Sequence, residues 1–158
     1  MDTVGDPILP PTICGEISLV GEFNNWGSDT ATMPDHMMTR DVNDPNFWTT
    51  IFELTVEDDH SDPPDNIVES KFRENCSWEV NWGSTDFPTG IGYPGYGNNI
   101  PVPLNPAYDT TIYYVTFNCA TGYYTFDDIS GDAPVSNPGD PDHYGDAEHR
   151  EAIQTKHR

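Results

Sequence analysis

The segment Phe47-Trp-Thr-Thr-Ile-Phe-Glu-Leu-Thr-Val56 decides the fold class of this 158-residue chain. Large apolar side chains alternate along it with threonine and glutamate, which is the period-two pattern of a β-strand with one buried face. Thr49 and Glu53 are expected on the opposite face. The side chains expected to face the core are Trp48, Phe52, Leu54 and Val56.

Strands of the same kind are expected on both sides of this segment. The run from Ile17 to Phe23 alternates apolar and polar side chains before turn-forming residues end it. Residues 111–118 and 123–129 are β-rich runs joined by a short turn, in which Gly122 can supply the positive φ that a tight hairpin needs. The chain is therefore predicted to end its domain on a hairpin.

Residues 67–75 alternate again, with Val68 and Phe72 pointing one way and Lys71 and Arg73 the other. Burying two unpaired cations is costly, so we expect the second face to be wet or to hold a ligand. This strand therefore points to a functional surface as well as to a core.

The 15 prolines and 13 glycines lie between short extended runs, and helical periodicity is almost absent before residue 146. The pattern predicts an all-β chain, an immunoglobulin-like (early-set) antiparallel β-sandwich of about seven strands over residues 13–130. Residues 1–12 are expected to be an extended Pro-rich leader. Residues 131–158 are expected to be an acidic Pro/Gly-rich linker with a short helix at 147–156.

The formal net charge of -21 excludes nucleic acid and anionic membrane surfaces as expected partners. No run of about 20 apolar residues occurs, so no membrane span is expected. The first residues lack the features of a signal peptide, so an earlier cleavage or another export route is expected. The predicted location is extracellular or on the cell surface, with a virion surface as a further option.

Cys14, Cys76 and Cys119 are an odd set, so at most one intramolecular disulfide can form and one thiol is left over. Their spacing fits no zinc or redox motif. Whether Cys76 and Cys119 pair is left open.

Two tryptophans and two cations are the candidate ligand-binding groups. Trp26 and Trp78 lie beside turn residues, where an indole is expected to face solvent. Lys71 and Arg73 are two of the three basic residues before Arg150, on a strand that runs toward Trp78. Sugars present a flat C–H face ringed by hydroxyls, so aromatic planes beside hydrogen-bond donors suit them.

Two asparagines add to this set. Asn98 is the last residue of a long Gly-rich loop over residues 83–98, and Asn99 follows it. An amide can donate to one hydroxyl and accept from its neighbour, which matches a vicinal diol. Plain turn residues are the alternative interpretation of this pair.

Three segments carry a resemblance to a known family: GEFNNWG (21–27), SKFRENCSW (70–78) and GNNIPV (97–102). In this order they resemble the motifs of glycogen- and starch-binding modules of family 48. The resemblance implies an α-glucan site in which Trp26, Lys71, Trp78 and Asn98 or Asn99 bind the sugar.

The chain also resembles the Sus-type outer-membrane starch-binding lipoproteins. The similar segments are Lys71 to Asn75, Trp78 to Gly83 and the Thr121 to Tyr124 hairpin. The resemblance covers about residues 13–129 and neither tail. An acidic insert at 57–65 and the Gly-rich loop depart from the pattern and are expected to cover or reshape the site.

Structural interpretations stand beside these functional ones. Trp26 and Trp78 are alternatively packing residues, and Trp82 is predicted to be one. Lys71 and Arg73 alternatively neutralise neighbouring glutamates on the surface. Packing tryptophans would be buried, whereas a sugar site requires indoles that reach solvent.

The acidic tail and the scattered carboxylates are not predicted to be chemical sites. Residues 140–151 approach the spacing of a calcium loop, but Tyr144 and Ala147 break it, and a solvated tail is favoured. No nucleophile and base can be paired, so the chain is not expected to be an enzyme, and no metal or other cofactor is predicted.

The leading hypothesis is a non-catalytic module that binds a polysaccharide or oligosaccharide, with an α-glucan as the favoured ligand. Trp26 and Trp78 stack on sugar rings, while Lys71, an asparagine at 98 or 99 and Arg73 hold hydroxyls. The alternative is a structural subunit of an extracellular filament or virion surface that self-assembles through its two tails.

Overall fold

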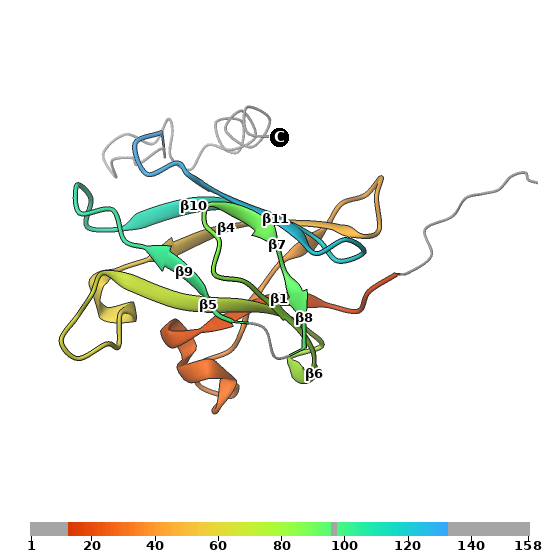
Figure 1. Cartoon of the computed structure of the whole chain (residues 1–158), viewed down its shortest axis with the longest axis horizontal. Helices are drawn as coiled ribbons and strands as arrows, with labels where there is room; N and C mark the ends of the chain where they lie inside the picture. The colour runs from red at the N-terminus through yellow and green to blue at the C-terminus, as the bar shows by residue number, and fades with distance from the viewer. Residues whose placement is uncertain (1–12, 96–97, 133–158) are drawn as a thin grey trace, which may run out of the picture.

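Two antiparallel sheets packed around a common core make up the described part of the chain, residues 13–95 and 98–132 of the computed structural model (Figure 1). The predicted leader, nearly all of the predicted linker and the C-terminal helix lie outside these residues. The all-β class is confirmed, with more and shorter strands than the sequence pattern predicted.

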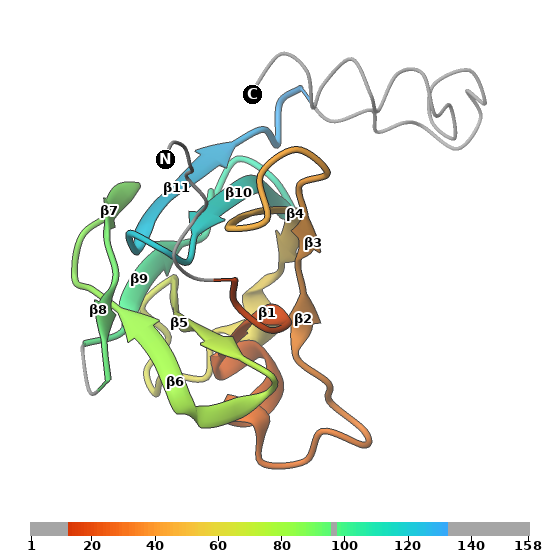
Figure 2. The same ribbon diagram turned by 90° about the vertical axis from the view of Figure 1, so that its right-hand side faces the viewer.

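The first sheet has the strand order β2-β1-β5-β6-β8, and β9 also pairs with β5. Figure 2 shows β5 between β1 and β6 in this sheet. The first half of β5 pairs with β9 and its second half with β6 on the same side, so the neighbour of β5 changes at Lys71. The strands are β1 (Ile17–Gly21), β2 (His36–Met37), β5 (Ile67–Glu74), β6 (Ser77–Gly83), β8 (Tyr93–Pro94) and β9 (Ile100–Pro103).

The second sheet has the order β3-β4-β10-β11-β7. The predicted terminal hairpin is confirmed as β10 and β11, and Gly122 in its turn has a φ of 84°. The strands are β3 (Thr39–Arg40), β4 (Phe47–Leu54), β7 (Thr89–Ile91), β10 (Thr111–Asn118) and β11 (Tyr123–Asp128).

Aromatic side chains join the sheets. The rings of Phe72 on β5 and Phe117 on β10 stack with centroids 4.2 Å apart. Trp82 meets Phe117 edge-on at 5.0 Å and is buried, as predicted. Burial of these large apolar surfaces is the main contribution to the stability of the sandwich core.

A disulfide fastens the segment before β1 to the β10–β11 turn. It joins Cys14 to Cys119, which are 105 positions apart in the sequence. Cys76 keeps a free, exposed thiol. The question left open by the sequence is answered: Cys119 pairs with Cys14, not with Cys76.

Two expectations about strand ends are wrong. The strand expected to run to Phe23 ends at Gly21, and Phe23 belongs to the 3-10 helix η1 (Glu22–Gly27), where its ring packs on Phe52 at 5.0 Å. Val56 was expected on the core face, but it begins a second 3-10 helix, η2 (Val56–Asp58), and is 70 % exposed. Side-chain alternation does not report where the backbone leaves the sheet.

Candidate functional site

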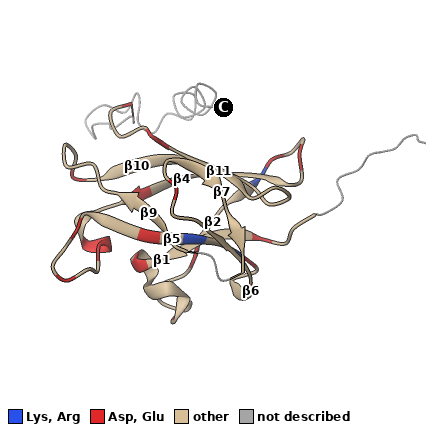
Figure 3. Ribbon diagram, in the orientation of Figure 1, with Lys and Arg blue, Asp and Glu red and all other residues tan. Residues whose placement is uncertain are grey.

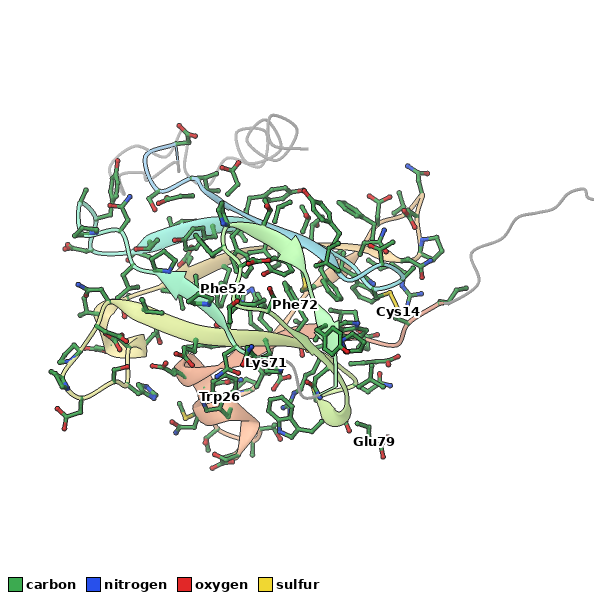
Figure 4. The ribbon with its side chains drawn as sticks, viewed as in Figure 1. Cys14, Trp26, Phe52, Lys71, Phe72 and Glu79 are labelled. Atoms are coloured by element: carbon green, nitrogen blue, oxygen red, sulfur yellow. A yellow bond between two sulfur atoms is a disulfide. The ribbon has the colours of Figure 1, made fainter. Side chains whose placement is uncertain are left out.

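The outer face of the first sheet carries η1, which contacts β1 and β5 (Figure 1). This helix lies on the side of the sheet away from β4 and β10. Figure 4 shows Trp26 and Lys71 on this outer side, whereas Phe52 and Phe72 lie between the sheets. The candidate site is therefore on the opposite side of the sheet from the core.

Trp26 owes its position to an unusual turn. Asn25 and Trp26 have positive φ angles of 54° and 57°, and Gly27 follows with 73°. The side chain of Asn24 accepts a hydrogen bond from the backbone N–H of Gly21 at 3.0 Å, which ties the turn to the end of β1. Asparagine and glycine tolerate this backbone conformation, and here they bring a half-buried indole onto the sheet face.

Trp78 lies in an irregularity of β6. Arg73 pairs with Asn81 while Glu74 pairs with Ser77, so residues 78–80 have no partner in β5. The Asn81 side chain donates to the Trp78 carbonyl at 2.9 Å and closes this bulge. Bulges re-aim side chains, and this one leaves Trp78 45 % exposed.

The two indoles converge. The ring centroids of Trp26 and Trp78 are 6.2 Å apart, and their planes are inclined by 40°. The sequence placed both residues in loops, whereas the structure places one in η1 and the other in β6. Together they form what we call the tryptophan pair.

Arg73 lies against the Trp78 ring of this pair. Its guanidinium carbon is 4.8 Å from the centroid of the Trp78 ring. Its Nε and Nη2 atoms donate to the two carboxylate oxygens of Asp35, each at 2.7 Å, and the side chains are only 2 % and 0 % exposed. The face of β5 was expected to be wet or to hold a ligand. At Arg73 it is instead covered, because Asp35 supplies the counter-charge that makes burial of the guanidinium tolerable.

Asp35 is a site residue that sequence reasoning missed. Burial alone would raise its pKa, but the hydrogen bonds from Arg73 and Ser18 and the Arg73 charge together hold the pKa below its ordinary value. Ser18 Oγ donates to Asp35 Oδ2 at 2.6 Å. The one signal in the sequence was an arginine on β5 that needed a partner, and nothing there identified which of 27 acidic residues supplies it.

Lys71 lies where β5 changes neighbours. It is 5 % exposed, and desolvation by burial lowers its pKa. A Cβ added at Gly83 would lie 2.5 Å from Lys71 Nζ and would overlap the Asn98 carbonyl. The absence of a side chain at Gly83 therefore leaves room for the Lys71 amine and the Asn98 carbonyl, which both approach this position.

The two asparagines are placed differently. Asn99 is half-buried, and its side-chain nitrogen donates to Glu69 Oε1 at 2.8 Å. Asn98 is exposed. The structure thus brings both beside the Lys71 end of the site, with the Asn99 amide already held by Glu69.

The acidic insert packs beside η1. Asp59 Oδ2 accepts the backbone N–H groups of Asp65 and Asn66, at 2.9 and 2.7 Å. Glu22 of η1 accepts from the backbone N–H of His60 at 2.8 Å. The insert is thus tied to the helix that bears Trp26.

Basic residues are few in the described ranges. Lys71 and Arg73 on β5 and Arg40 on β3 are the Lys and Arg residues there, and Figure 3 shows the acidic residues spread over many loops. Within 13–95 and 98–132 no group of three His, Cys, Asp or Glu side chains is arranged to hold a metal ion. No helix in that part is long and apolar enough to cross a membrane. The calcium-like pattern of the tail lies outside those residues.

Comparison with known proteins gives one distant likeness. No protein family matches the sequence, and no curated protein matches it. Among solved structures, SusF from Bacteroides thetaiotaomicron matches with a TM-score of 0.47 and 18 % identity over 77 % of this chain. The chain spans 26 % of that protein. A likeness this distant assigns no role to any residue, so the site stands on its own geometry.

Proposed function

We propose that this chain is a non-catalytic carbohydrate-binding module. The tryptophan pair is the observation that carries the proposal, because two partly exposed indoles 6.2 Å apart offer apolar planes at the surface. An indole buries up to about 150–250 Å² when fully covered. The C–H faces of sugar rings match such planes, and hydroxyl groups at the ring edges remain free for polar contacts.

Lys71 and Asn98 are proposed as the polar groups of this site. Lys71 brings a buried amine with a lowered pKa to the same side of the sheet. The exposed Asn98 amide can donate to one hydroxyl and accept from the next. Asn99 is committed to Glu69, so Asn98 is the better candidate of the two.

We further propose an α-glucan as the ligand. The 40° inclination between the indoles suits consecutive rings of a curved chain better than those of a flat ribbon. The order of Trp26, Lys71, Trp78 and Asn98 also follows the family 48 motifs that the sequence resembles. The net charge of -21 favours a neutral polysaccharide over an acidic one.

The module is proposed to act outside the cell or at its surface. Its fold is proposed to be an immunoglobulin-like sandwich. The assembly alternative depends on the two tails, of which only Gly131 and Asp132 are among the described residues. We therefore do not propose it.

Calorimetry on the full chain tests the proposal, with glycogen and soluble malto-oligosaccharides as ligands and a β-glucan as the comparison. Binding of the α-glucans is expected, with affinity reduced at least roughly tenfold in Trp26→Ala and in Trp78→Ala. Tyr108→Ala, which removes an exposed aromatic ring from the loop between β9 and β10, is the matched control and should bind normally. Binding that survives both tryptophan substitutions would refute the site, and preference for the β-glucan would refute the ligand.

A further inference from the structure

We infer, on the basis of the proposed function, that Arg73 is a positioning residue. Asp35 holds its guanidinium by two hydrogen bonds, and Trp78 packs on the plane of that guanidinium. This contact fixes the angle between the Trp78 and Trp26 rings. From the sequence, Arg73 was expected to donate to sugar hydroxyls. With Nε and Nη2 both committed to Asp35 and the side chain 2 % exposed, it acts on the ligand through the tryptophan.

The backbone alone does not fix the Trp78 ring. Residues 78–80 have no ladder partners in β5, and the hydrogen bond from Asn81 holds the Trp78 carbonyl rather than its side chain. Trp78 is 45 % exposed, so much of its ring surface has no protein packed on it. The Trp26 ring lies 6.2 Å away, and the Arg73 guanidinium, 4.8 Å from the ring centroid, is the nearer group and orients the ring.

The guanidinium is itself immobile. Two parallel hydrogen bonds to Asp35 fix its plane, and Ser18 Oγ also donates to Oδ2 of this carboxylate. The strand pairing of β5 with β1, in which Arg73 faces Ser18, sets this arrangement within the sheet. A lysine could keep the charge but could not present a flat surface in a fixed orientation.

The same guanidinium also contacts the turn that bears Trp26. A Cβ added at Gly27 would overlap Nη2 of Arg73 and lie 2.9 Å from its central carbon. Gly27 directly follows Trp26, so the backbone beside one indole and the ring of the other both lie against one rigid group. The Arg73 guanidinium therefore helps to position both rings.

A fixed pair of rings lowers the cost of binding, because the ligand does not have to order a mobile side chain. Without Arg73, the Trp78 ring would sample several rotamers, and affinity is expected to fall roughly tenfold. The tryptophan rings would still make the same types of contact with the sugar.

The decisive variant is the double substitution Arg73→Met with Asp35→Asn, which removes both charges and leaves no unpaired carboxylate. Two tryptophans this close should give an exciton couplet in far-UV circular dichroism, assigned by its loss in Trp26→Phe and in Trp78→Phe. The double variant is expected to lose most of this couplet and to bind malto-oligosaccharide roughly tenfold more weakly.

Arg40 offers a matched control. Its guanidinium carbon also lies 4.8 Å from a tryptophan ring, that of Trp48, outside the site. Arg40→Met should keep both the couplet and the affinity. Val68→Ala, a core substitution, controls for a loss of stability that leaves the rings in place.

Retention of the couplet and of wild-type affinity in the double variant would overturn the inference. If that variant does not fold, Arg73→Lys decides: it keeps a charge opposite Asp35 and should still weaken the couplet, and an unchanged couplet would overturn the inference. If the wild type binds no glycan, the proposed function fails, while the couplet still decides whether Arg73 positions the rings.

Discussion

Trp26 from η1 and Trp78 from the bulge of β6 present their indoles 6.2 Å apart, with 40° between the ring planes. The remaining two tryptophans, Trp48 and Trp82, are buried. Changes in tryptophan emission on ligand addition should therefore report on the surface pair.

The emission of the wild type is expected to shift on titration with malto-oligosaccharide. Trp78→Phe should reduce the signal and weaken binding by roughly three- to tenfold, because a smaller ring offers less stacking area. Fluorescence titration measures both effects. Binding detected by calorimetry without any change in emission would show that the ligand lies elsewhere.

Lys71→Met should separate binding from stability. A hydrogen bond to a charged group contributes about 1.5–3 kcal/mol, so the affinity for α-glucan is expected to fall at least roughly tenfold. Burial disfavours the lysine charge, so the free energy of unfolding should fall by less than the loss of binding free energy. Calorimetry and urea unfolding test the two parts, and a large loss of stability would assign Lys71 a structural role instead.

Removal of the disulfide should destabilise the fold. The bridge joins residues 105 positions apart, and loss of such a crosslink typically costs about 2–5 kcal/mol. Cys14→Ser with Cys119→Ser should lower the urea midpoint accordingly. Cys76→Ser changes only the free thiol and should leave the midpoint in place.

His36 should make stability depend on pH. Its Nε2 lies 2.8 Å from Thr50 Oγ1 and 3.1 Å from the Ile51 carbonyl of β4, and so links the two sheets. Burial lowers its pKa below the ordinary 6.5, although the Ile51 hydrogen bond and the Glu53 charge oppose this. The unfolded chain then binds the proton more readily, so stability is complete above 6.5 and falls as the pH drops toward the folded pKa.

Urea midpoints measured between pH values of about 7.5 and 5 test this dependence. The neighbouring Asp35 has a pKa lowered from 3.8, so its own contribution is lost only at more acidic pH. His36→Gln should flatten the profile in the His36 window. An unchanged profile in that variant would assign the dependence to other groups.

The strands and the inward faces were the predictable part of this molecule. Trp48, Phe52 and Leu54 are buried on β4 as the alternation indicated, and Val68 and Phe72 are buried on β5. These patterns are local, since one buried face forces period two wherever a strand lies on a core. The turn at Gly122 was also predictable, because it too depends on residues that are neighbours in the sequence.

The construction of the site was not predictable. The exposure of Trp78 depends on a bulge whose cause is the pairing of Arg73 with Asn81, and that register is a property of two strands together. Likewise, alternation correctly placed Arg73 away from the core but could not show that Asp35 would cover it. Contacts between segments far apart in sequence decide both features.

The bridge between Cys14 and Cys119 also determines how the module responds to mechanical load. Tension applied to the two ends of the described chain enters at Cys14, passes through the covalent bond to Cys119 and leaves along β11. The intervening residues, among them Trp26, Arg73 and Trp78, are outside this force path. In a module pulled between two anchors, the disulfide and β11 would therefore bear the load, and the segment that carries the tryptophan pair would not.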